Sequence, residues 1–143
     1  VFYPQSGIEK ITQSRTQSYL RSDFNRTLVD CLWHPEICGP TEIWATAWGR
    51  AKGRKEFDSK KICEYAILLG PLVAQKVAVM LELLGEGGTA KELIPKSILR
   101  RDRLASLVSD GPSLDDNMSK NEYWRVVFNI PEDQIQGWLS YGK

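Results

Sequence analysis

The longest apolar stretch of the chain, residues 65–84, is divided in two by Gly70-Pro71. Proline lacks a backbone donor and clashes with the preceding turn, so a helix must begin or bend at Pro71. In residues 71–84 the polar side chains form a narrow stripe of Gln75, Lys76 and Glu82 among Leu, Val, Ala and Met. A helix with so narrow a polar stripe is covered on most sides. We therefore expect residues 71–84 to form a buried central helix.

The same stretch is too polar to cross a membrane. A bilayer span needs about 20 consecutive apolar residues, whereas Gly70-Pro71 and Gln75-Lys76 interrupt this one. A lysine near the middle of a span costs about 2.5–3.5 kcal/mol on insertion scales. We predict no membrane span in the chain.

The rest of the chain also favours helices. Apolar residues recur every three or four positions over residues 8–33, and capping boxes begin at Thr89 and Ser119. We find no sustained alternation of apolar and polar residues and no Asn-Gly hairpin turn to indicate strands. No internal repeat or domain boundary is visible. We predict an all-α fold, in which residues 1–143 form a single compact domain of six to eight helices around the helix at 71–84.

Overall charge does not select a class of partner. The chain has 19 Lys and Arg against 18 Asp and Glu, a net charge of +1. No overall field therefore draws it to nucleic acid or to an anionic membrane, and any such affinity must come from a local patch. With 42% hydrophobic and 26% charged residues, the composition is that of a folded protein and argues against global disorder.

One local patch is strongly basic, because residues 48–61 hold six basic and two acidic side chains. Gly49 and Gly53 would let the backbone approach a phosphate chain, and Trp44, Trp48 and Phe57 would offer stacking faces. Basic loops with interleaved aromatic residues are typical of nucleic-acid binding, although a solvated loop between helices is the simpler alternative. We predict phosphate contacts from Arg50, Lys52, Arg54, Lys55, Lys60 and Lys61, with Arg100, Arg101 and Arg103 as a second strip.

No arrangement of residues indicates an enzyme. Residues 85–88 are rich in glycine but lack the spacing of a phosphate-binding loop, and no recognisable catalytic motif accompanies the sole histidine, His34. The apolar pattern of residues 124–138 is shared by helix-turn-helix DNA readers and ordinary helical hairpins. Carboxylates at Glu132 and Asp133 would repel phosphates and favour the hairpin. We predict a non-enzymatic protein that does not read a DNA sequence.

The histidine and the three cysteines form a candidate metal set. Their spacing is C-x2-H-x3-C, with the last cysteine after 24 further residues. The ligand count fits a closed Cys3His zinc site, although most such sites pair two short knuckles. A disulfide and three free thiols are the alternatives. Zinc held by Cys31, His34, Cys38 and Cys63 is therefore one hypothesis, and no other cofactor is expected.

Taken together, these features predict a structural protein that packages nucleic acid as a coat or nucleocapsid protein does, through backbone contacts without sequence specificity. DNA and RNA are not distinguished. Five tryptophans favour self-assembly or contacts with other protein subunits. The alternative is a helical protein–protein interaction module that binds no nucleic acid. An odd number of cysteines favours an intracellular or virion location, while sequons at Asn25 and Asn117 leave secretion open.

Overall fold

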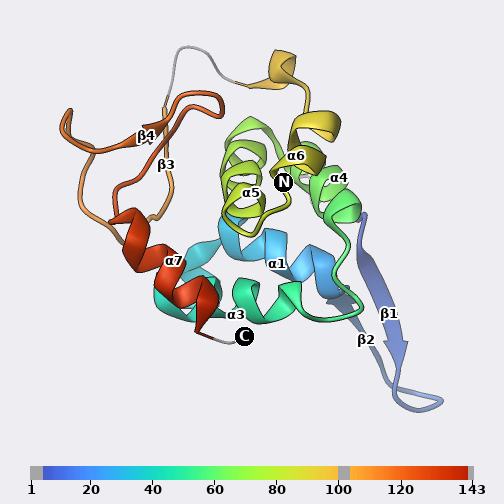
Figure 1. The fold of residues 1–143 in the computed structure, drawn as a ribbon. Helices are drawn as coiled ribbons and strands as arrows, with labels where there is room; N and C mark the ends of the chain where they lie inside the picture. Colours follow the sequence, from blue (N-terminus) through green and yellow to red (C-terminus); the bar gives the residue numbers. More distant parts are fainter. Residues whose placement is uncertain (1–4, 100–103, 142–143) are drawn as a thin grey trace.

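The computed structural model describes residues 5–99 and 104–141. Its helices are α1 (Phe24–Trp33), α2 (Pro35–Cys38), α3 (Thr41–Lys52), α4 (Ser59–Leu69), α5 (Pro71–Leu83), α6 (Gly87–Leu93) and α7 (Glu132–Ser140), with a 3-10 turn at Lys96–Ile98. Its strands are β1 (Ile8–Thr12), β2 (Ser18–Ser22), β3 (Ala105–Ser106), β4 (Lys120–Asn121) and β5 (Val126–Val127). Figure 1 shows the helices gathered around α5, with β1 and β2 extending away from them.

The prediction of an all-α fold is wrong, because the described residues include two sheets. The first is an antiparallel hairpin in which Ile8 of β1 lies opposite Ser22 of β2. The chain changes from strand to helix at Asp23, whose side chain accepts a hydrogen bond from the backbone N–H of Arg26 and so caps α1. The expected helix over residues 8–33 is therefore a hairpin followed by α1.

The second sheet replaces a helix that the sequence pattern predicts after Ser119. Its strand order is β3-β5-β4, with β3 parallel and β4 antiparallel to β5. The turn between β4 and β5 needs Arg125 in the left-handed backbone region, at φ 58°. A helix over residues 123–128 is incompatible with that conformation. The last helix, α7, does form, and it begins after Pro131.

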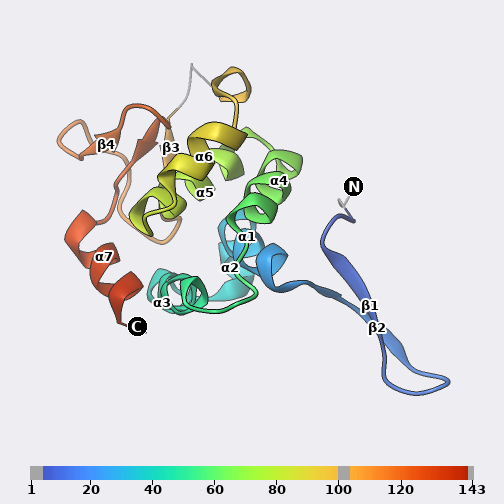
Figure 2. The same ribbon diagram turned by 45° about the vertical axis from the view of Figure 1, so that its right-hand side comes forward.

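Residues 71–83 form the buried helix α5, which begins at Pro71 directly after Gly70. Val77 and Met80 have no exposed surface, and α4, α6 and the β3-β5-β4 sheet pack around the helix (Figure 2). Its polar stripe is narrower than the sequence indicates, because Gln75 is also fully buried. Neither α5 nor any other helix in the described ranges is long and apolar enough to be a membrane span.

Helix α3 is held between α1 and α7 by two unusually direct contacts. Trp48 is buried, and its indole Nε1 donates to the carbonyl oxygen of Leu28 in α1 at 3.1 Å. Gly49 faces α7 so closely that a Cβ atom there would lie 1.9 Å from the carbonyl oxygen of Leu139. These contacts bring α1, α3 and the distant α7 around one surface depression.

Candidate functional site

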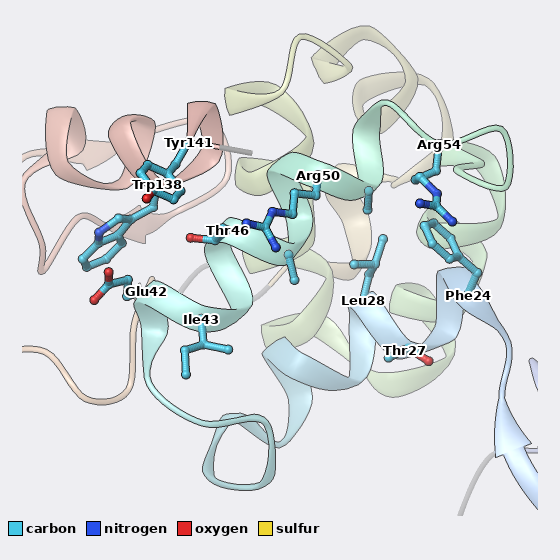
Figure 3. A pocket seen from close by; sticks show the side chains of 12 residues that line it. Phe24, Thr27, Leu28, Glu42, Ile43, Thr46, Arg50, Arg54, Trp138 and Tyr141 are labelled. Atoms are coloured by element: carbon cyan, nitrogen blue, oxygen red, sulfur yellow. The ribbon is translucent and has the colours of Figure 1, made fainter. Parts of the chain in front are cut away.

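A cavity of about 750 Å³ lies between α1, α3 and α7, and we refer to it as the α1–α3–α7 groove (Figure 3). Helix α3 supplies its centre, and α1 and the end of α7 supply its two sides. The lining residues are Phe24, Thr27, Leu28, Glu42, Ile43, Thr46, Ala47, Arg50, Ala51, Arg54, Trp138 and Tyr141.

Aromatic rings lie on both sides of this groove. In Figure 3, Trp138 and Tyr141 lie on one side, Phe24 lies on the other, and Arg50 extends from α3 between them. Trp138 is half-buried, whereas 79% of Tyr141 is exposed. Trp138 and Tyr141 are three residues apart, so they lie on the same face of α7 and its last turn. The groove therefore offers flat apolar surfaces that solvent or a ligand can reach.

Two guanidinium groups, of Arg50 and Arg54, accompany these aromatic rings, and both side chains are exposed. Nε of Arg54 is 3.9 Å from a carboxylate oxygen of Glu56, a long and exposed ion pair that contributes little. Arg50 forms no ion pair with a carboxylate in residues 5–99 or 104–141. The lining includes one carboxylate, Glu42. The groove thus combines an apolar floor with an excess of positive charge.

The other lysines of the predicted patch lie outside this groove lining. Lys52 forms an ion pair with Glu86 and lies 5.4 Å from the centre of the Phe57 ring, so its charge is already engaged. Lys55 is exposed in the loop after α3. Lys60 and Lys61 are exposed in the first turn of α4, beside the capping carboxylate of Asp58. The predicted second strip of Arg100, Arg101 and Arg103 lies outside the described residues.

Two of the three aromatic residues expected to offer stacking faces do not do so. Trp44 and Trp48 are buried in the core, and Phe57 is half-buried beneath Lys52. The accessible rings come instead from α1 and α7, which sequence reasoning assigned to packing. The sequence of α7 contained a weak indication of this. Its buried residues are Ile135 and Leu139, which are four positions apart, whereas Trp138 and Tyr141 share a different helical face.

The candidate zinc ligands are not gathered into one site. Cys31 and Cys63 are buried, Cys38 is half-buried, and all three are free thiols. Nδ1 of His34 lies 2.8 Å from a carboxylate oxygen of Glu36. Within the described ranges no group of three His, Cys, Asp or Glu side chains is placed to hold a metal ion. The zinc hypothesis stays a prediction that this geometry does not support.

Burial also disfavours the thiolate form of the two buried thiols. Burial raises the pKa of Cys31 to about 12, with a further contribution from a hydrogen bond with Cys38. Burial likewise raises the pKa of Cys63 to about 12. Zinc binds thiolates rather than thiols. A metal would have to overcome this preference for the protonated form.

No family model, curated protein or solved structure matches the chain. The α1–α3–α7 groove has three features that bear on function. These are its aromatic sides, its apolar floor and Arg50, which pairs with no carboxylate among the described residues.

Proposed function

We propose that this protein binds nucleic acid without reading its sequence, in a structural and non-enzymatic role such as coating or packaging. The supporting observation is the placement of Arg50 and Arg54 on the rim of a groove with aromatic sides. Guanidinium groups bind phosphates through paired, charge-assisted hydrogen bonds. Lys55, three residues beyond the end of α3, adds a third exposed positive charge near them in sequence.

A single strand fits this groove better than a duplex does. Stacking on Trp138, Tyr141 or Phe24 requires unpaired bases, because the faces of paired bases are covered by their neighbours in the duplex. Each base stacked on an aromatic ring contributes about 1–3 kcal/mol, largely independently of base identity. Phosphate contacts likewise position the strand without specifying its sequence. We therefore propose binding to single strands of any sequence, DNA or RNA.

The near-neutral charge of the whole chain agrees with this role. A coating protein must bind the polymer through one surface and meet neighbouring subunits through others. Here Arg50, Arg54 and Lys55 place three exposed positive charges at or near one groove, while Lys52 is neutralised by Glu86. Binding is accordingly expected at low salt, with a steep decline as salt is added.

The test is a titration of a fluorescent single strand of about 20 nucleotides, followed by anisotropy at several salt concentrations. The triple variant R50A/R54A/K55A should weaken binding. It should also reduce the slope of log K against log salt by about 0.7 per lost contact, or roughly 2 units in total. The control variant K91A/K96A/K120A removes the same charge from residues that do not line the groove, and it should bind as the wild type does.

A second variant tests stacking separately from charge. Tyr141 is exposed, so Tyr141→Ala should fold normally yet weaken binding by roughly 10-fold, through the loss of one stacked base. The slope against salt should stay unchanged. The proposal is overturned if the wild-type protein binds no single strand at low salt, or if R50A/R54A/K55A binds as tightly as the wild type.

The second candidate function is a protein–protein interaction module, and the apolar character of the same groove favours it. Ile43 lines the groove with 60% of its surface exposed, together with the rings of Trp138 and Tyr141, and a contiguous exposed apolar patch is typical of interaction sites. An amphipathic helix could place its apolar face there. Under this alternative the protein does not bind oligonucleotides. Under the nucleic-acid proposal the protein binds them at low salt, and R50A/R54A/K55A weakens that binding.

A further inference from the structure

The β1–β2 hairpin, residues 8–22, extends from the body as an arm (Figures 1 and 2). Its base is attached by the backbone N–H of Asp23, which donates to the carbonyl oxygen of Gly7, and by Ser22, whose hydroxyl donates to Asp30. Farther out, its large apolar residues are uncovered: 48% of Tyr19 and 65% of Leu20 are exposed. Consecutive strand residues point to opposite faces, so the arm exposes one large apolar side chain on each face, away from its own core.

A hairpin of this kind needs a partner. Two strands alone are marginally stable in water, and a third strand or a packed surface is normally required. Within the described chain each of the two strands pairs with the other and with no further strand, so both outer edges keep unpaired backbone donors and acceptors. Such edges are ready templates for contact with another molecule.

The charge of the arm indicates the chemistry of that partner. Arg21 pairs with Glu9 across the hairpin at 2.7 Å, so these two charges cancel. Lys10 and Arg15 remain, and neither forms an ion pair within residues 5–99 or 104–141. The arm thus carries two free positive charges beside exposed Tyr19 and Leu20. An acidic surface with some apolar character would complement it.

One segment near the other end of this chain is rich in acidic residues. Residues 110–133, here called the acidic end, hold six acidic and two basic side chains. Leu114 is also exposed within this segment, as are Asp116 and Glu122, and Nζ of Lys120 lies 3.7 Å from a carboxylate oxygen of Glu122, a long and exposed ion pair that contributes little. In both ribbon views β4 and α7 lie on the side of the body away from the arm. The arm therefore cannot reach the acidic end of its own molecule.

We propose that the arm of one molecule docks on the acidic end of a second copy. Lys10 and Arg15 would face the carboxylates, and Leu20 would pack near Leu114 of the other copy. Each copy then has one donating and one receiving surface, which differ from one another. Such a head-to-tail contact can be repeated, and it produces rings or open filaments rather than a symmetric dimer.

The contact is expected to be weak and sensitive to salt. An arm of two five-residue strands covers less than the roughly 1,600 Å² of a standard interface. Its charges are exposed, so they are largely screened once the Debye length falls to a few ångströms. For a contact of this size we expect a Kd in roughly the micromolar range at low salt. The association should be lost near about 0.5 M salt.

Sedimentation velocity of protein freed of nucleic acid tests the proposal, over roughly 5–200 µM and at about 0.05 and 0.5 M salt. K10E/R15E alters the arm and D116K/E122K alters the acidic end, and each variant alone should associate at least 10-fold more weakly than the wild type. The controls K60E/K61E and E64K/E92K make the same charge changes at exposed positions on α4 and α6. Both controls should associate like the wild type.

Mixing the two altered variants gives the sharpest outcome. The intact arm of D116K/E122K can dock on the intact acidic end of K10E/R15E, and the two reversed surfaces also carry opposite charges. The mixture should therefore recover the association that each variant alone has lost. A contact that does not join the arm to the acidic end would give no such recovery.

The proposal is overturned if the wild-type protein stays monomeric at low salt, if either altered variant associates normally, or if the mixture does not pair. Association that appears only after an oligonucleotide is added would also overturn it, and would assign the arm to nucleic acid instead. Circular dichroism of each variant identifies any loss of folding. Leu20→Ser provides an uncharged variant of the arm that should also weaken association.

Discussion

Replacing Gly49 by alanine tests the contact that holds α7 against α3. In the structure a Cβ at this position would lie 1.9 Å from the carbonyl oxygen of Leu139 and 2.6 Å from its carbonyl carbon. Since Cβ atoms essentially never approach other heavy atoms closer than 3.0 Å, the two helices must separate by about 1.1 Å. The obstructing atoms belong to the backbone, so no side-chain rotation can relieve the clash.

The expected loss of stability is the difference between two opposing effects. Overpacking in a well-packed core typically costs about 1–3 kcal/mol, and a backbone clash belongs at the upper end of this range. Alanine is also a better helix former than glycine by about 1 kcal/mol. Gly49→Ala should therefore lower the free energy of unfolding by roughly 2 kcal/mol net.

Gly137→Ala is the matched control, because it makes the same chemical change in α7. A Cβ at Gly137 meets no described atom within 4 Å. The gain in helix propensity is then unopposed, and the variant should be more stable than the wild type by up to about 1 kcal/mol. The same glycine-to-alanine change is thus expected to have opposite effects on stability at two positions on facing helices.

Urea unfolding, followed by far-ultraviolet circular dichroism, measures both variants. With an m-value of about 2 kcal/mol/M, Gly49→Ala should lower the unfolding midpoint by roughly 1 M, and Gly137→Ala should raise it by less than that. If Gly49→Ala were as stable as the wild type, α3 and α7 would not be in direct contact. The description of the groove would then be wrong as well.

Three further predictions concern the core. Val77→Asp should cost several kcal/mol in urea unfolding, because Val77 has no exposed surface, whereas Leu68→Asp on the outer side of α4 should cost little. Gln75→Leu should cost about 1–3 kcal/mol in the same assay, because the buried Gln75 amide donates to the carbonyl oxygens of Trp124 and Arg125 at 2.9 and 3.3 Å. Stability should fall as pH rises from about 9 towards 12, by up to about 1.4 kcal/mol per pH unit for each of Cys31 and Cys63. Below pH 9 both thiols are protonated in the folded and in the unfolded chain. Above pH 9 they ionise first in the unfolded chain, which favours unfolding. A free energy of unfolding that stayed constant from pH 8 to 11 would contradict the burial of these thiols.

The helices were more accessible to sequence reasoning than the strands, for local reasons. Pro71 and the apolar residues after it specify α5 almost alone, and Asp58 and Pro131 mark the starts of α4 and α7. The β1–β2 hairpin offers no comparable signal. Ile8 and Ile11 fit a helical ladder as well as a strand, and the turn at residues 13–17 contains no glycine. Its exposed strands also lack the alternation that a buried face imposes.

The basic residues of the candidate site could be predicted from the sequence, but the shape of the groove could not. The basic run identified Arg50 in α3 and Arg54 in the loop that follows, and both line the groove. Whether Lys52 is available depends on Glu86, which is 34 residues away in sequence. The aromatic sides of the groove come from Phe24 and Trp138, more than a hundred residues apart. Neither the contact of Lys52 with Glu86 nor the placement of Phe24 opposite Trp138 leaves a periodic pattern in the sequence. Only the tertiary structure shows them.

Gly49 links the stability of the fold to the proposed binding surface. From sequence, its lack of a side chain suggested close approach to a phosphate chain, but the structure uses that space for Leu139 of α7. The close approach of α7 then places Trp138 and Tyr141 across the groove from Phe24, with Arg50 between them. A ligand that needs this arrangement binds the folded chain alone, so at 100 times its Kd it should stabilise the wild type by about 2.7 kcal/mol. The same ligand concentration should stabilise Gly49→Ala less, because separating α3 from α7 moves the aromatic rings away from Arg50 and raises the Kd.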